Sequence, residues 1–159
     1  MATPTYTLID STTLTSSASS VTFSSIPAGG DLVLVVSATS GHAGGAMFLT
    51  FNGDTGSNYP QVYMNGNGSS ANSGTFTSTS IIFGELGTNP SQAIAEISDY
   101  SATDKHKSTL SKGASIDSTI RAVAARWANT SAITSLNVSA SETYISGDTF
   151  HLYGIAKEL

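Results

Sequence analysis

The sequence predicts an all-β protein that folds as a single antiparallel β-sandwich of about eight to ten strands. Short runs of strand-forming residues recur along the 159-residue chain, and turn residues interrupt them about every 8–12 positions. Only 11% of the residues are charged, against about 25% in an ordinary soluble domain. Serine, threonine and 15 glycines fill the shortfall, and these residues suit half-buried strands and turns.

The first third of the chain contains four predicted strands. The run from Leu32 to Val36 is apolar on both faces, which is typical of a central strand covered on both sides. The next run alternates, with Met47, Leu49 and Phe51 on one side. The four strands are expected at residues 5–10, 20–26, 31–39 and 46–52.

The middle of the chain begins with residues 53–74, which are rich in glycine and asparagine and predict a long loop. One strand is expected over residues 75–86 and another over 93–100. The polar stretch 105–115 fits an exposed strand or a loop. Residues 118–129 suit a strand or an amphipathic helix, and the β-branched Ile120 and Val123 favour the strand. The last two strands are expected at 133–141 and 149–155.

The charge and composition exclude several classes of function. The net charge of −5 does not provide the basic surface of a general nucleic-acid binder. The chain has no cysteine, so it has no disulfide and no thiolate metal site. No apolar run reaches the ~18 residues of a membrane span, and the N-terminus does not resemble a signal peptide. We therefore expect a protein made in a cytoplasm, with no membrane or nucleic-acid partner.

The stretch FNGDTGSNYP, residues 51–60, contains the Asp-Thr-Gly triplet of aspartic proteases. Those enzymes use two carboxylates, and their aspartate follows hydrophobic residues, whereas Asn52 and Gly53 precede Asp54 here. Calcium prefers six to eight oxygens with several acidic ligands, and Asp54 is the only carboxylate in the stretch. The sequence favours a polar turn, with Tyr59 folding back to pack.

Other catalytic constellations are weak. The three histidines are isolated, and no nucleophile elbow or phosphate-binding loop occurs. The carboxylate pairs Glu85 with Glu96 and Asp99 with Asp104 have the chemistry to flank a glycosidic bond, but the sequence does not fix their separation. We expect no enzyme activity, no metal and no cofactor.

Both arginines, Arg121 and Arg126, lie in one predicted element beside Trp127, the only tryptophan. Arginine and tryptophan are common in interface hot spots. A core tryptophan covered by an arginine stem is the equally weighted alternative.

Five stretches of the chain carry a resemblance to known proteins: FSSIPAGGDLVLVVSATS (23–40), FLTFNGDTGSNY (48–59), EISDYSATDKHKS (96–108), ARWANTSAITSLNVSAS (125–141) and ISGDTFHLYGI (145–155). Through these stretches the chain resembles a group of small virion structural proteins of cyanophages and other marine phages. The resemblance implies a jelly-roll-like sandwich that attaches to a capsid or a tail, with a head decoration (cement) protein as the first expectation. It offers no catalytic residues.

A cement protein would bind the major capsid protein on the outer surface of the head. We expect residues 1–20 to form an N-terminal arm or first strand that contacts the partner, and residues 21–159 to form the sandwich. A homotrimer is expected because three-fold positions of capsids are common docking sites. The expected interface residues are Tyr6, Leu8, Tyr59, Tyr63, Arg121, Arg126 and Trp127.

The alternative is a tail or head-fibre module that binds a host-surface glycan. Sugar sites on β-sandwiches need exposed aromatic rings with amide or carboxylate groups nearby. Tyr59, Tyr63, Asn58 and Asn65 have that chemistry.

Overall fold

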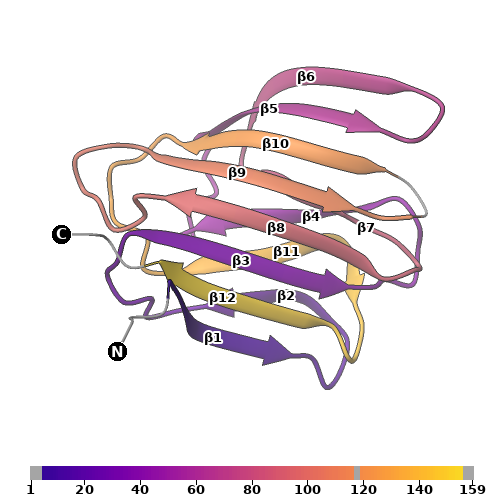
Figure 1. The fold of residues 1–159 in the computed structure, drawn as a ribbon, viewed down its shortest axis with the longest axis horizontal. Coiled ribbons are helices and arrows are strands. Elements are labelled where there is room, and N and C mark those ends of the chain that lie inside the picture. The colour runs from indigo at the N-terminus through magenta and orange to yellow at the C-terminus, as the bar shows by residue number, and fades with distance from the viewer. Residues whose placement is uncertain (1–4, 117–118, 156–159) are drawn as a thin grey trace.

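A computed structural model describes residues 5–116 and 119–155, which form two stacked antiparallel sheets without a helix. The larger sheet has the strand order β1-β12-β3-β8-β9-β10-β5-β6, and the smaller sheet has the order β2-β11-β4-β7 (Figure 1). The strands are β1 Tyr6–Thr13, β2 Ala18–Phe23, β3 Asp31–Ala38, β4 Gly45–Phe51, β5 Tyr59–Gly66, β6 Ala71–Ser78, β7 Ile81–Leu86, β8 Ser91–Ser98, β9 Lys107–Ala114, β10 Ile120–Trp127, β11 Leu136–Tyr144 and β12 Thr149–Ile155.

The all-β antiparallel sandwich is confirmed, whereas its strand number is higher than expected. The described residues form twelve strands, because the stretch 105–115 contributes β9 and the predicted loop contributes a hairpin. The jelly-roll topology implied by the resemblance stays a prediction. No described helix has the length and hydropathy of a membrane-spanning segment.

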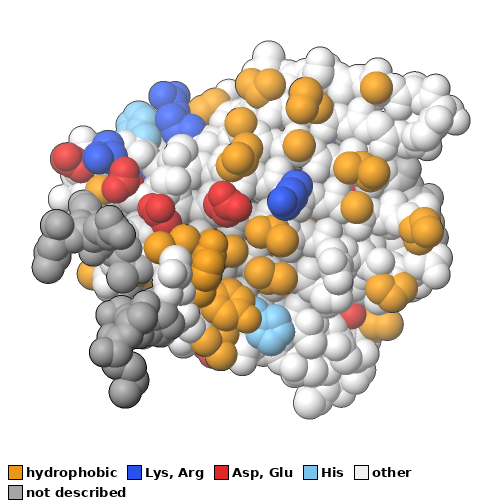
Figure 2. All heavy atoms as spheres, in the orientation of Figure 1, with side chains coloured by type: hydrophobic (Ala, Val, Ile, Leu, Met, Phe, Trp, Pro, Cys, Tyr) orange, Lys and Arg blue, Asp and Glu red, His pale blue; other side chains and the backbone are white. Residues whose placement is uncertain are grey.

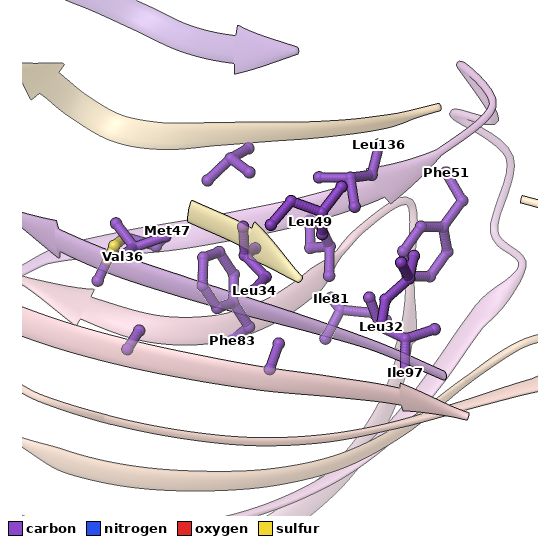
Figure 3. Packing of buried hydrophobic residues seen from close by; sticks show 14 of the residues in the cluster. Leu32, Leu34, Val36, Met47, Leu49, Phe51, Ile81, Phe83, Ile97 and Leu136 are labelled. Atoms are coloured by element: carbon purple, nitrogen blue, oxygen red, sulfur yellow. The ribbon is translucent and has the colours of Figure 1, made fainter. Parts of the chain in front are cut away.

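The hydrophobic core lies between the two sheets and follows the alternation of the strands. Met47, Leu49 and Phe51 are fully buried on one side of β4, as the sequence predicts. Leu32 and Leu34 of β3 face them from the larger sheet (Figure 3). Burying each such side chain contributes about 1.5–3 kcal/mol relative to leaving it exposed.

The prediction that β3 is covered on both faces is wrong. Val33 and Val35 alternate with buried residues and remain partly exposed on the outer face of the larger sheet. No second layer of the described chain covers this face, because the smaller sheet packs only against the inner one. An apolar outer face is therefore a feature of the fold.

The prediction of a loop over residues 53–74 is also wrong, since most of it forms the hairpin of β5 and β6. β5 pairs with β10 along its length, which satisfies its backbone without an apolar sequence. Asn67 closes the hairpin, where its Oδ1 accepts hydrogen bonds from the backbone N–H groups of Ser69 and Ser70. Gly68 provides the positive φ of +85° that this turn requires.

The predicted single strand over residues 75–86 is divided between the two sheets. β6 ends at Ser78 in the larger sheet, and β7 begins at Ile81 in the smaller one. Gln61 stabilises the passage of the chain from one sheet to the other. Its Nε2 donates a hydrogen bond to Ser80 O at 2.8 Å, and its Oε1 accepts one from Ile82 N at 3.0 Å.

The described part of the expected N-terminal arm belongs to the sandwich. β1 pairs with β12 from Tyr6 to Thr13, with an irregularity between Leu8 and Asp10. β1 is an edge strand, so its second backbone edge has no partner in the described chain. The segment is thus ordered by its own chain and still presents a free strand edge.

Candidate functional site

The FNGDTGSNYP stretch is a tightly bonded turn between β4 and β5, as the sequence favours. Asn52 and Gly53 have φ angles of 51° and 69°, in the left-handed region that Asn-Gly tolerates. The Asn52 side chain accepts hydrogen bonds from Thr134 N and Ser135 N and donates one to Ala132 O. The turn therefore fastens the loop that precedes β11.

The carboxylate of Asp54 accepts hydrogen bonds that stabilise this turn. Its Oδ2 accepts from the Trp127 indole N–H at 2.7 Å and from the Asn58 amide at 2.9 Å, and its Oδ1 accepts from Gly56 N at 2.9 Å. These donors, the indole first, hold the pKa of Asp54 below its ordinary value of 3.8. Among the described residues, no group of three His, Asp or Glu side chains is placed to hold a metal ion.

We expect Asp54→Asn to lower the free energy of unfolding by about 2 kcal/mol at pH 7, because it weakens hydrogen bonds to a charged acceptor. The folded-state pKa is depressed, so this contribution is complete above about pH 3.8 and is lost as pH falls through the folded-state value. Urea unfolding of both proteins should thus show a difference in the free energy of unfolding that becomes smaller as the pH is lowered. The exposed Asp10→Asn is the control, with a change below about 0.5 kcal/mol. A constant difference from pH 7 to pH 2 would contradict the proposed role of the charge.

The structure removes Tyr59 and Trp127 from the expected interface. Both are almost fully buried, and their rings pack against Phe51 at 6.1 Å and 5.7 Å between ring centroids. The Tyr59 hydroxyl donates to Asp54 O, and burial raises the pKa of Tyr59 to about 12. The core-tryptophan alternative is correct for Trp127, although Asp54 rather than an arginine stem binds its indole. Tyr59 therefore cannot present its ring to a glycan.

Arg121 is also turned inward, toward the smaller sheet. Its guanidinium forms an ion pair with Glu85 of β7 and lies 5.3 Å from the centre of the Tyr63 ring. Tyr63 itself is half-buried and packs edge-on against Phe76 at 5.9 Å. Arg121 therefore connects the two sheets, and Tyr63 packs beside it rather than forming a free contact surface. Glu85 lies between the sheets and Glu96 is exposed on the outer face, so the two cannot flank one glycosidic bond.

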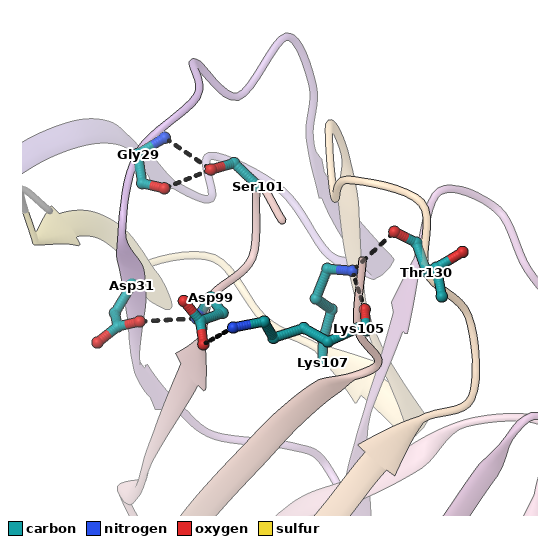
Figure 4. Close-up of polar contacts among 7 residues, drawn as sticks. All are labelled: Gly29, Asp31, Asp99, Ser101, Lys105, Lys107 and Thr130. Carbon is teal, nitrogen blue, oxygen red and sulfur yellow. Dashed lines mark hydrogen bonds and ion pairs between the residues drawn. The ribbon is translucent and has the colours of Figure 1, made fainter. Parts of the chain in front are cut away.

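The loops at one end of the sandwich are fastened by polar contacts (Figure 4). Lys107 is fully buried, and its ammonium donates to Lys105 O at 2.8 Å and Thr130 O at 3.1 Å. Burial lowers the pKa of Lys107. Asp31 accepts from Asp99 N at 2.7 Å, and this bond fixes the residue that follows β8. These contacts are structural, and the polar sequence of β9 does not reveal them.

The outer face of the larger sheet carries an apolar surface that the sequence reading missed. Leu110 of β9 is 60% exposed, and Met64 of β5 is 65% exposed. The strand registers place them on the same face as Val62, Ala122 and Ala124. Figure 2 views this face and shows hydrophobic side chains spread over it with few charges between them. The sequence indicates this surface by apolar residues on both faces of β3 and at the outward-facing positions of β5, β9 and β10.

Two shallow hollows shape this outer face. One of about 630 Å³ lies between Met64 and Ile120 at the tip of the β5–β6 hairpin. The other, of about 510 Å³, lies beside Leu110 and is bordered by Arg126. Arg126 is thus an exposed residue of this face, and its place in an interface stays a prediction. Tyr6 and Leu8, 56% and 52% exposed, lie on the edge strand β1.

The comparisons with known proteins support the fold. No protein-family model and no curated protein matches the chain. A solved structure of exo-inulinase from Aspergillus awamori superimposes with a TM-score of 0.51 at 15% identity, over 94% of this chain and 29% of the inulinase. This chain thus corresponds to less than a third of the inulinase, and the likeness shows a shared β-sandwich.

Weaker matches are an alginate lyase and a human SPRY domain. The lyase gives a TM-score of 0.26 at 7% identity, over 82% of this chain and 71% of the lyase. The SPRY domain gives 0.21 at 10% identity, over 90% of this chain and 99% of that domain.

Proposed function

We propose that this chain is a non-enzymatic structural protein of a phage virion that decorates the outer surface of the head and binds the major capsid protein. The resemblance in sequence suggests the virion. The observation that carries the mode of binding is the β1 edge, where a free strand edge lies beside exposed Tyr6 and Leu8. Main-chain pairing along such an edge gives affinity, and side chains at alternate positions give specificity.

The surface chemistry of the chain supports an assembly role. The strand β1 is rich in threonine and carries Asp10 as its only charge, so docking would desolvate little charge. The carboxylates Asp54 and Glu85 are engaged in hydrogen bonds or ion pairs within the fold. Each copy would add its own contact to the shell, so that many weakly bound copies stabilise it together.

The proposal is tested by measuring how many copies purified virions contain. Quantitative gel staining should give a copy number on the scale of the major capsid protein, and cryo-electron microscopy should show the sandwich on the shell. Absence from the shell would refute the decoration role. A few copies confined to the tail would favour the glycan-binding alternative instead.

A matched pair of variants tests the docking edge. We expect the double substitution Tyr6→Ser and Leu8→Ser to reduce binding to undecorated heads at least tenfold, because it removes the two exposed apolar side chains of β1. Ile116→Ser is the control, since Ile116 is also exposed but lies in the turn after β9. Equal binding by both variants would place the capsid contact elsewhere.

A further inference from the structure

Four residues at the centre of the larger sheet form a self-complementary arrangement. β8 and β9 are the fourth and fifth of its eight strands. Their register places Ile94 opposite Lys112 and Glu96 opposite Leu110. All four border one hollow of about 180 Å³ on the outer face. We call these four residues the central quartet.

The two charges of the central quartet have no partner in the described chain. Glu96 and Lys112 are exposed, and neither forms an ion pair or a side-chain hydrogen bond with another described residue. They occupy one diagonal of the quartet, and the apolar Ile94 and Leu110 occupy the other. From ordinary strand spacings, each diagonal measures about 8 Å, too long for a direct ion pair. Figure 2 shows an acidic and a basic side chain near the middle of this face.

We propose that two copies of this chain associate through the outer faces of their larger sheets, around a two-fold axis that runs close to Ile94 and Leu110. A rotation about an axis along this apolar diagonal exchanges the ends of the charged diagonal. Glu96 of each copy then faces Lys112 of the other, and Leu110 packs against its symmetry equivalent. One rotation satisfies both charges and covers both apolar residues.

The position of the two-fold axis determines the angle at which the strands of the two copies cross. An axis along the diagonal of a strand pair makes the strands of the two copies cross at roughly 70–90°, the orthogonal mode of sheet packing. Ala114, Ala122 and Ala124 surround the quartet on this face and let the second sheet approach closely. The edge strands β1 and β6 lie outside the overlap, so the proposed capsid contact stays available.

The size of the contact predicts its strength. Two sheets with strands about 20 Å long overlap over roughly 400 Å² per copy when they cross at right angles, which is at the weak end of specific interfaces. We therefore expect a dimer with a dissociation constant in the micromolar range. The charges would act mainly on specificity, because each disfavours any surface that carries the wrong sign opposite it.

Sedimentation equilibrium of the purified chain at increasing concentration tests this contact without any capsid. The wild type should pass from monomer to dimer. Glu96→Lys and Lys112→Glu should each weaken self-association at least tenfold, because both place like charges opposite each other across the axis. Mixing the two single variants should restore a dimer containing one copy of each, and the double variant should restore the homodimer.

The control is Glu142→Lys, which changes the net charge as Glu96→Lys does but lies on β11 of the smaller sheet. It should dimerise like the wild type. Circular dichroism verifies that each variant is folded, as expected for exposed positions. A wild type that stays monomeric or forms the expected trimer, or charge variants that dimerise normally, would each overturn the proposal. None of these results bears on the virion copy number, so the decoration role stands or falls separately.

Discussion

Gly113→Val should abolish the cooperative unfolding transition, and Gly113→Ala should lower the free energy of unfolding by about 3 kcal/mol. The two sheets approach closely where β7 packs against β8 and β9. A Cβ atom added to Gly113 would lie 2.7 Å from the Cα of Gly84 and 3.3 Å from the Cβ of Ala93. The nearest atom belongs to the backbone of the opposite sheet, so it cannot rotate away, and the sheets would have to separate.

Guanidinium unfolding followed by the fluorescence of Trp127 measures this effect. Gly41→Ala is the matched control, because an added Cβ there meets no atom within 4 Å. It should change the free energy of unfolding by less than about 0.5 kcal/mol. If Gly113→Ala were as stable as this control, the close approach of the sheets would not exist in solution.

Glu85→Ala should lower the free energy of unfolding by about 3 kcal/mol, because it leaves the guanidinium of Arg121 without its carboxylate partner between the sheets. The Glu85 side chain is only 6% exposed and that of Arg121 only 17%, so water cannot replace the lost carboxylate. Replacing both residues, as in Glu85→Leu with Arg121→Met, should return the stability to within about 1 kcal/mol of the wild type. Apolar side chains of similar volume need no charge partner.

A double-mutant cycle in urea separates the pair from its surroundings. The exposed pair of Lys105 and Asp99, 50% and 41% exposed, is the comparison, and Lys105→Met should change stability by less than about 0.5 kcal/mol. If Glu85→Ala cost no more than Lys105→Met, the Glu85–Arg121 contact would not be a buried ion pair.

The sequence predicts the strands that obey the usual rule of apolar residues inside. β4 alternates clearly, and its buried side is the one that the pattern indicates. β9 reverses this rule, because Lys107, Thr109 and Ser111 face inward while Leu110 faces solvent. Small inward-facing side chains are needed where β7 of the smaller sheet packs closely against β9, and no pattern in the sequence predicts that contact. This reversal is why β9 remained ambiguous between a strand and a loop.

The candidate surface was harder to predict than the fold for a related reason. The aromatic and charged residues that suggest an interface, Tyr59, Arg121 and Trp127, are recruited by the turn at Asp54 and by Glu85. The partners of Arg121 and Trp127 are distant in sequence, so only the fold reveals them, whereas Tyr59 packs within its own turn, as the sequence favours. The outer face instead consists of common residues such as Leu110 and Ala122, which become a surface only when five strands align them.

The pairing of the first strand with the last has a consequence for how the protein is made. β12 lies between β1 and β3 in the larger sheet, and β1 has no other strand partner in the described chain. During synthesis, the segment that forms β1 leaves the ribosome before Thr149–Ile155 and cannot pair until that strand follows. At about 5–20 residues per second, this delay lasts roughly seven to thirty seconds. From the emergence of β3 until β12 follows, the edge of β3 is open to strands of neighbouring nascent chains, so the yield of folded protein should depend on how crowded its ribosomes are.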